Sequence, residues 1–188
     1  MRRIALLLAL MLLFAACIDV GYGNFTVKIT INRDGSYSFG YDGIMGMKPE
    51  KDQTDEQLAQ ELQKGTMEFK ELKPLGNHCF KVLYECQGDK KRPLSFFGDR
   101  DTSLVVIEYL GDTVVLVKIG QKLLDATKEN YKNYNLQYEG TVSITTDAKV
   151  LQHNAQTAPW FTLWGTSTYQ WKLTSLETPA GTMVLQLP

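Results

Sequence analysis

Cys17 is the side chain whose position most clearly predicts a chemical role. It follows a charged start, Met1-Arg2-Arg3, an apolar run from Ile4 to Phe14, and the small residues Ala15-Ala16. This order of a charged region, an apolar region and small residues at a cleavage point is the layout of a secretory signal. We therefore expect residues 1–16 to form a signal peptide that is cleaved before Cys17.

The segment Leu13-Phe14-Ala15-Ala16-Cys17 resembles the lipobox of bacterial lipoproteins, although Phe14 stands where that pattern usually has Leu or another aliphatic residue. The resemblance implies that Cys17 carries the lipid. Lipoproteins of this type usually carry three acyl chains, and stable attachment takes more than one. The resemblance therefore also implies a lipid-anchored protein of the cell envelope. Ile18, rather than Asp, favours the outer membrane if the cell has two membranes. The alternatives are a cleaved soluble export signal and an uncleaved anchor, for which the apolar run is shorter than the roughly 20 residues of a span.

Two further cysteines, Cys79 and Cys86, lie in a segment without a turn signal. In one strand they would be about 23 Å apart at about 3.3 Å per residue, and a disulfide needs Cα atoms within about 7 Å. Their odd spacing also places them on opposite faces of the strand. We expect free thiols, unless a bulge or turn between them brings the sulfur atoms together.

Other reactive side chains give no catalytic or metal-binding pattern. The histidines, His78 and His153, and the two remaining cysteines do not supply the four ligands of a zinc site at workable spacing. The sequence contains no Gly-x-Ser-x-Gly elbow and no phosphate-binding glycine loop. Asp99 and Asp101, which flank Arg100, are interpreted as a loop salt cluster. We expect no metal, no cofactor and no enzyme activity, although a catalytic triad assembled in space would leave no sequence pattern.

An aromatic loop follows Pro159 and is the candidate binding site. Its apolar side chains are Trp160, Phe161, Leu163 and Trp164, and Gly165 ends it. Trp favours surfaces where one side is apolar and the other is wet. The loop either contacts a lipid, an apolar ligand or a partner, or folds back to close the open end of a sheet.

The elements that must position these residues are mostly strands. Phe25–Ile31 alternates apolar and polar residues and is followed by an Asp34-Gly35 turn and a second alternating run from Tyr37. Asn32, Asp34 and Ser36 suggest a calcium loop, but the distal Glu is missing, which favours a plain turn. Residues 41–52 are interpreted as a loop. A helix is predicted to begin after Thr54, which forms a capping box with Gln57, and to end at Gly65.

The rest of the chain adds more strands and one ambiguous segment. Residues 122–134 have helical spacing and predict a second helix. Strands are predicted at residues 67–72, 79–85, 104–110, 113–119, 136–145, 150–151, 168–173 and 183–187. Strands joined by hairpins with few helices predict an α+β domain: an antiparallel sheet with one or two short helices packed on it.

Composition is that of one globular domain. Removal of residues 1–16 leaves 172 residues, a size that suits a single domain. We divide them into a lipidated tether at 17–24, carrying Gly21 and Gly23, and a domain at 25–188. Arg2 and Arg3 leave with the signal, so 18 basic residues face 21 acidic ones, a net charge of −3. The absence of a basic excess argues against a nucleic-acid partner.

The stretch Tyr138–Ala155 resembles a segment of the LppM-type bacterial lipoprotein domain, in which a strand leads into an Asn-Ala turn, here Asn154-Ala155, and a Trp-bearing strand, here Trp171, follows. Many members end in a membrane helix, and from this sequence, which ends at Pro188, we expect none. The resemblance implies an α+β surface domain that handles lipid or glycolipid, with no catalytic residues. We therefore predict a membrane-anchored, non-enzymatic binding module for lipid or another apolar ligand. The alternative is an assembly lipoprotein that binds another envelope protein.

Overall fold

Alternating apolar residues build a hairpin at the start of the domain. The computed structural model describes residues 20–47, 53–65, 69–97, 103–120, 131–132, 134–160 and 165–188. In it, β1 (Val20–Ile31) and β2 (Tyr37–Met47) pair antiparallel around the predicted Asp34-Gly35 turn. Phe25, Val27, Ile29 and Ile31 are buried, as their alternation predicts.

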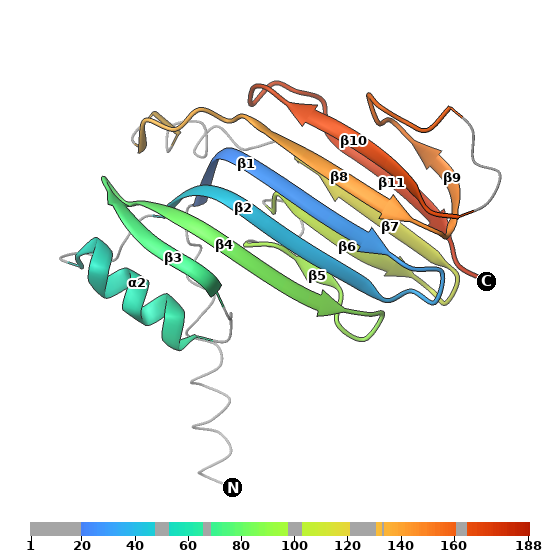
Figure 1. Ribbon diagram of the computed structural model, residues 1–188, viewed down its shortest axis with the longest axis horizontal. Helices are drawn as coiled ribbons and strands as arrows, with labels where there is room; N and C mark the ends of the chain where they lie inside the picture. Colours follow the sequence, from blue (N-terminus) through green and yellow to red (C-terminus); the bar gives the residue numbers. More distant parts are fainter. Residues whose placement is uncertain are drawn as a thin grey trace, which may run out of the picture.

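Six strands form the larger sheet, in the order β10-β8-β1-β2-β4-β3. The strands beside the opening hairpin are β3 (Phe69–Gly76), β4 (Cys79–Gly88), β8 (Gly140–Thr146) and β10 (Ser167–Leu173). β1 pairs parallel with β8, from Phe25 opposite Gly140 to Ile31 opposite Thr146, and the other pairs are antiparallel. β1 is therefore a central strand of a mixed sheet (Figure 1).

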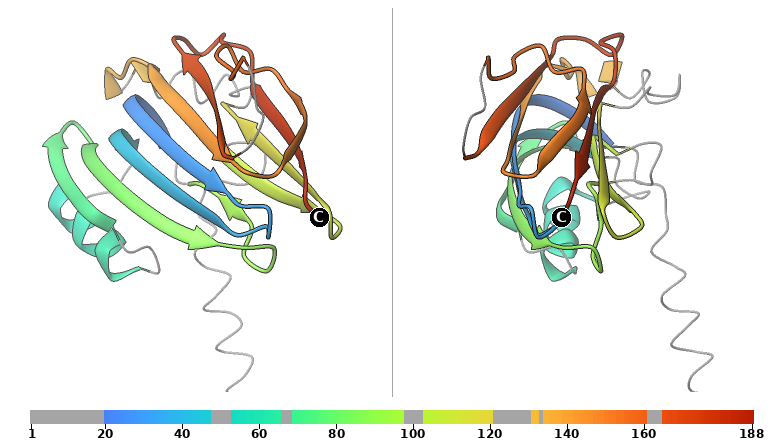
Figure 2. Two further views of the ribbon diagram at one scale, coloured as in Figure 1. Left: turned by 45° about the vertical axis from the view of Figure 1, so that its right-hand side comes forward. Right: turned by 90° about the vertical axis from the view of Figure 1, so that its right-hand side faces the viewer.

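Five strands form the second sheet, in the order β5-β6-β7-β11-β9. They are β5 (Leu94–Ser95), β6 (Val105–Leu110), β7 (Val114–Ile119), β9 (Lys149–His153) and β11 (Gly181–Gln186). The chain passes from β8 in one sheet to β9 in the other, and again from β10 to β11. The two sheets lie face to face (Figure 2).

Aromatic rings fill the space between the sheets. Phe96, which follows β5, lies 4.7 Å from Phe39 and 4.9 Å from Tyr41, measured between ring centroids. Tyr22 also contacts Phe96, and its hydroxyl donates a hydrogen bond to the carbonyl of Phe97 at 2.8 Å. Burial raises the pKa of the Tyr22 and Tyr41 hydroxyls well above the usual value.

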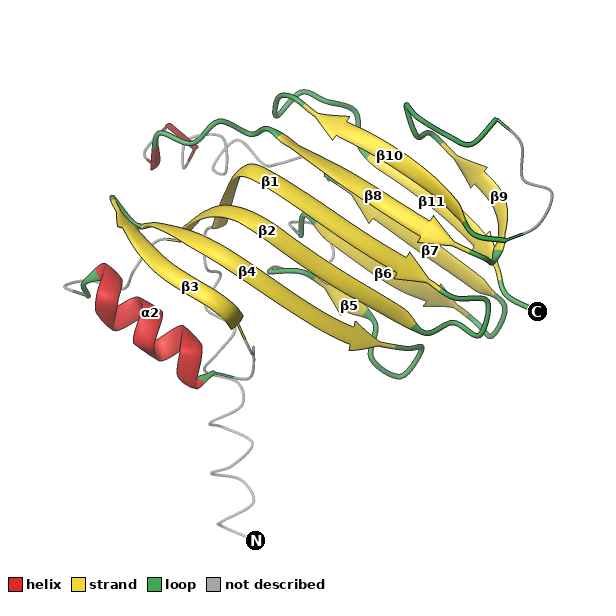
Figure 3. Ribbon diagram, viewed as in Figure 1, coloured by secondary structure: helices red, strands yellow, loops and turns green. Residues whose placement is uncertain are grey.

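The predicted helix is confirmed as α2 (Asp55–Lys64) and lies beside β3 (Figure 3). The Thr54 hydroxyl accepts a hydrogen bond from the Gln57 backbone N–H, and the Gln57 side chain accepts one from the Thr54 N–H, so the capping box is complete. Leu58 and Ala59 are its buried side chains.

The predicted α+β class is wrong, because the fold is β-rich. A second sheet covers the first, where we expected one or two helices on a single antiparallel sheet. The physical reason is that each alternating strand leaves one apolar face to bury, and many such strands bury their faces against each other as a sandwich. The second helix was predicted at residues 122–134, most of which lie outside the described residues; Tyr131, Lys132 and Tyr134 are helical.

Two segments that we predicted to be irregular belong to β-strands. β1 begins at Val20, within the expected tether, and β2 continues to Met47, within the expected loop. The glycines there serve close packing. A Cβ at Gly21 would lie 3.2 Å from the Leu136 Cδ1, and one at Gly46 would lie 2.6 Å from the ring of Tyr134. Residues 134–136 thus cover the outer face of the sheet where β1 begins.

Candidate functional site

The segment that contains Cys17, the predicted lipid-bearing residue, directly precedes β1. Cys17 lies outside the described residues, and so does the predicted signal peptide. Val20, three residues later, is buried and pairs with Met47. The backbone N–H of Tyr22 donates to the hydroxyl of Tyr131 at 2.7 Å, which ties the start of β1 to the residues that cover it.

Trp160 is the described member of the predicted aromatic loop, and its side chain is fully exposed. Phe161, Leu163 and Trp164 lie outside the described residues. Exposure of a whole indole costs hydrophobic free energy, about 25 cal/mol for each Å² of apolar surface left in water. At Trp160 the ring does not fold back onto the sheet, so the plug interpretation does not hold for this residue.

Asn154 holds the chain before Trp160 against two strands. Its side-chain oxygen accepts hydrogen bonds from the indole Nε1 of Trp171 in β10 at 2.9 Å and from the N–H of Thr182 in β11 at 2.7 Å. Its amide nitrogen donates to the carbonyl of Ala180 at 2.8 Å. Asn154 thereby joins the edge strands of both sheets, because it directly follows β9. The sequence motif that contains Asn154 and Trp171 is thus a structural clamp.

Residues Gln156 and Thr157 continue this support along β10. Thr157 and Gln170 exchange backbone hydrogen bonds of 3.2 and 2.9 Å, and the Gln156 side chain bonds both the N–H and the carbonyl of Lys172. They partly cover the edge of the six-stranded sheet, which would otherwise present unpaired backbone groups. Trp160 therefore follows a segment whose backbone is fixed.

The histidines and cysteines do not form a joint site. His78 Nδ1 lies 2.6 Å from Asp55 Oδ1, which ties the β3–β4 turn to the start of α2, and the ring of His153 contacts Tyr169 at 4.7 Å. Cys79 is buried, its sulfur donates to the carbonyl of Tyr134, and burial raises the pKa of its thiol.

Cys79 and Cys86 lie toward opposite ends of β4, opposite Gly46 and Phe39, and both are free thiols. Over the described ranges, no three His, Cys, Asp or Glu side chains gather as a metal site. Asp99, Arg100 and Asp101 are outside those ranges.

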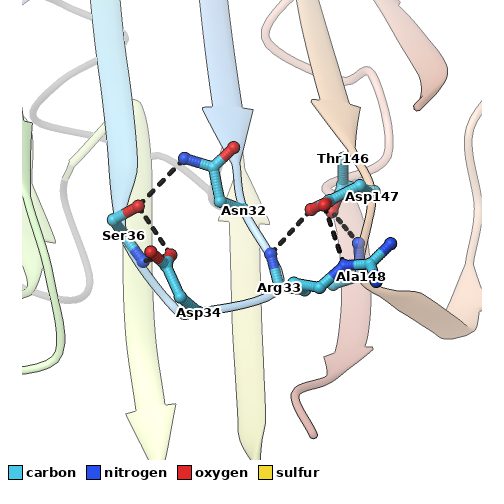
Figure 4. Close-up of polar contacts among 7 residues, drawn as sticks. All are labelled: Asn32, Arg33, Asp34, Ser36, Thr146, Asp147 and Ala148. Atoms are coloured by element: carbon cyan, nitrogen blue, oxygen red, sulfur yellow. Dashed lines mark hydrogen bonds and ion pairs between the residues drawn. The ribbon is translucent and has the colours of Figure 1, made fainter. Parts of the chain in front are cut away.

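The Asp34 turn is held by its own side chains (Figure 4). Asp34 accepts hydrogen bonds from the N–H and the hydroxyl of Ser36, which lower the pKa of its carboxyl group, and Asn32 donates to the Ser36 hydroxyl. Beside it, Asp147 accepts from both the backbone N–H and the Nε of Arg33, at 2.6 and 2.9 Å. These contacts show that residues 32–36 form a plain turn. The contacts of Arg33 with Asp147 link this turn to the β8–β9 turn.

Around Phe96 the described interior is occupied by aromatic side chains, whose ring contacts fill the space between the sheets. A surface hollow of about 140 Å³ lies beside β5 and β6, lined in part by Lys90, Glu108 and Tyr109. Pockets that enclose small molecules usually measure about 300–1,000 Å³. Within the described ranges, no helix has the length and apolar character needed to cross a membrane.

Comparison with known proteins was made at the level of sequence and of structure. No protein-family model matches the chain, and no curated protein matches it. Among solved structures, the chain is similar to the NMR structure of the folded domain of Mycobacterium tuberculosis LppM, with a TM-score of 0.41 and 11% sequence identity over 87% of this chain and 88% of that chain. The predicted resemblance to LppM-type domains is therefore supported in part, and a likeness this weak carries no inference about function.

Proposed function

We propose that the protein is a lipid-anchored, non-enzymatic binding module of the bacterial cell envelope, and that it binds through the loop that begins at Trp160. The observation that carries this proposal is the fully exposed indole of Trp160 after a segment fixed by Asn154, Gln156 and Thr157. An indole that lies fully in water gains hydrophobic free energy when a ligand or partner buries it.

The anchor is the second part of the proposal. The signal layout ends at Cys17, and the fold begins three residues later. A lipid on Cys17 would thus attach the domain directly to a membrane, the outer membrane where the cell has two. Cys79 is buried with a raised thiol pKa, which supports a binding role over thiol catalysis at this residue.

The ligand is proposed to be a lipid or another apolar molecule that meets the surface at Trp160. The aromatic packing around Phe96 supports contact at the surface over enclosure at that place between the sheets. The second candidate is an envelope protein that binds the same loop. It is favoured by the same observation, since Trp is enriched among the residues that carry most of the binding energy at protein interfaces.

Photo-crosslinking in cells tests the binding site and separates the two candidates. A benzoylphenylalanine at position 160 should give an adduct whose mass identifies a lipid or a protein. The matched control is position 110, an exposed leucine on another hairpin. Equal adducts at both positions, or none at position 160, would contradict the proposed site.

Substitution tests the site and the anchor independently. Trp160→Ala combined with Trp164→Ala should weaken binding more than it lowers the melting temperature. A large fall in melting temperature with binding intact would instead show that the loop is structural. Cys17→Ser should release or mislocalise the protein, and an unchanged mass and membrane fraction would refute the anchor.

A further inference from the structure

The length of chain between Cys17 and β1 restricts where a membrane can lie. Two residues, Ile18 and Asp19, separate Cys17 from Val20, and the three steps between their Cα atoms span at most about 11 Å. Val20 cannot move away to lengthen this reach, because it is buried and paired with Met47. If Cys17 carries the lipid, as proposed above, the end of the sandwich at Val20 lies against the bilayer.

Strand register identifies what else lies at this end, which we call the anchor pole. Met47 donates its N–H to the carbonyl of His78, and Gly46 pairs with Cys79. The β3–β4 turn at residues 76–78 is therefore beside Val20. The N-terminus of α2 is also there, because Asp55 bonds His78.

The opposite end, the far pole, is about 36 Å away, for the 11 residue steps from Val20 to Ile31 at about 3.3 Å each. It contains the Asp34-Gly35 turn, the Asp147 turn and the β6–β7 turn at residues 111–113. Tyr109 fixes the last of these, since its hydroxyl donates to the carbonyl of Gly35 at 2.6 Å.

Two exposed leucines occupy matching places at the two poles. Leu75 is 51% exposed next to the β3–β4 turn, and Leu110 is 53% exposed next to the β6–β7 turn. Leu75 has the exposed Lys73 two residues before it, a favourable neighbour for anionic head groups. The other exposed large apolar side chains lie toward the far pole. Leu151 follows Val150, which is in register with Leu185, Val115 and Tyr109.

Trp160 also belongs to the half nearer the far pole. Thr157 pairs with Gln170, which is in register with Ser143 and Lys28, eight residue steps along β1 from Val20. These steps correspond to about 26 Å. The chain then continues to Ser167, which is in register with Thr146 and Ile31 at the end of β1.

From this geometry we propose that the anchor pole rests on the membrane that holds the lipid, with Leu75 at the boundary between head groups and acyl chains. Trp160 then lies away from that membrane, so a ligand that it contacts comes from elsewhere in the envelope. This inference depends on the proposed lipid anchor and adds the orientation of the domain.

The test uses the full acylated protein in nanodiscs of phosphatidylethanolamine and phosphatidylglycerol that contain a gadolinium-labelled head-group lipid. Leucine methyl groups and tryptophan indoles are isotope-labelled, and the signals are assigned with Leu75→Ile, Leu110→Ile and Trp160→Phe. The Leu75 methyl signals should broaden several-fold more than those of Leu110, while the Trp160 indole signal keeps its width. Equal broadening of both leucines, or stronger broadening at Leu110 or Trp160, would overturn the orientation.

Mass spectrometry of the same sample separates failure of the orientation from failure of the anchor. A chain without lipid on Cys17 overturns both proposals together. A chain that carries the lipid but shows no preference for Leu75 overturns the orientation alone. Leu75→Ser should reduce the broadening of neighbouring signals relative to Leu110→Ser, and equal effects of the two substitutions would also contradict the contact.

Discussion

Replacement of Asn154 by alanine tests the clamp that supports the candidate loop. The substitution removes the acceptor of the Trp171 Nε1–H and Thr182 N–H bonds and the donor to the Ala180 carbonyl. Trp171 is 2% exposed, so water reaches its ring poorly. We expect the free energy of unfolding to fall, and the chain after β9 to lose its fixed connection to β10 and β11.

The size of the effect follows from the burial of each partner. A buried donor left without an acceptor costs about 1–3 kcal/mol, and a hydrogen bond near the surface contributes about 0.5–1.5 kcal/mol. Because water can replace the bonds to Thr182 and Ala180, we expect a total loss of about 2–3 kcal/mol. For a chain of this size that corresponds to a fall in melting temperature of about 4–12 °C.

Urea unfolding followed by tryptophan fluorescence measures this loss. Asn154→Asp, which keeps an acceptor for Trp171, is the matched control and should lose less stability than Asn154→Ala. In a double-mutant cycle with Trp171→Phe, which cannot donate, the two losses should be less than additive by about 1 kcal/mol. A loss below about 0.5 kcal/mol for Asn154→Ala, the range of surface substitutions, would refute the clamp.

Three further predictions address packing, thiols and tyrosines. Gly46→Val should destabilise the fold by about 1–3 kcal/mol through overpacking, since even a Cβ there would lie 2.6 Å from the Tyr134 ring; an unchanged urea midpoint would contradict this. Burial raises the pKa of the Cys79 and Cys86 thiols, so both should resist iodoacetamide at neutral pH in the native protein and react once it is unfolded without reductant. Burial also raises the pKa of Tyr109 to about 12. Because the unfolded chain ionises first, this contribution to stability is complete below pH of about 10 and is lost as the pH rises further, which alkaline titration at 295 nm measures.

Local sequence signals predicted those elements well whose formation depends on a few neighbouring residues. The Asp34-Gly35 turn and the Thr54–Gln57 capping box both depend on contacts within four residues, and both are present. The β6–β7 hairpin around Gly111 was found for the same reason. Such features need no knowledge of the rest of the chain.

Features that depend on distant partners were missed. Gly21 reads locally as a flexible tether, yet it is small because Leu136 packs on it. The parallel pairing of β1 with β8 joins residues more than 100 positions apart, and alternation alone does not show which strand lies beside which. The second sheet was missed because an alternating pattern of apolar residues shows only that one face of a strand is buried. Helices and another sheet can cover that face equally well.

The candidate loop was proposed from composition, and the hydrogen bonds that support the chain before it were not predicted. Trp160 is conspicuous in the sequence as part of an aromatic cluster, and it is exposed in the structure. Asn154 and Trp171 were noticed as parts of a family-like pattern, but the hydrogen bond between them crosses 17 residues and is visible only in the fold. Leu75 carries no sequence signal at all, since its position at the anchor pole follows from strand register.

The central place of β1 would give the proposed lipid anchor a mechanical consequence. β1 pairs with β2 from Val20 and with β8 only from Phe25, so a pull on Cys17 would act first on residues held by one ladder of hydrogen bonds and then on residues held by two. The second ladder forms only after residues 140–146 have been made, because β8 supplies it. Non-local pairs of this kind close late in folding. If Cys17 carries the proposed lipid, the short tether joins the membrane to a central strand of the sheet, and it keeps the domain close to the membrane with the Val20 end toward it.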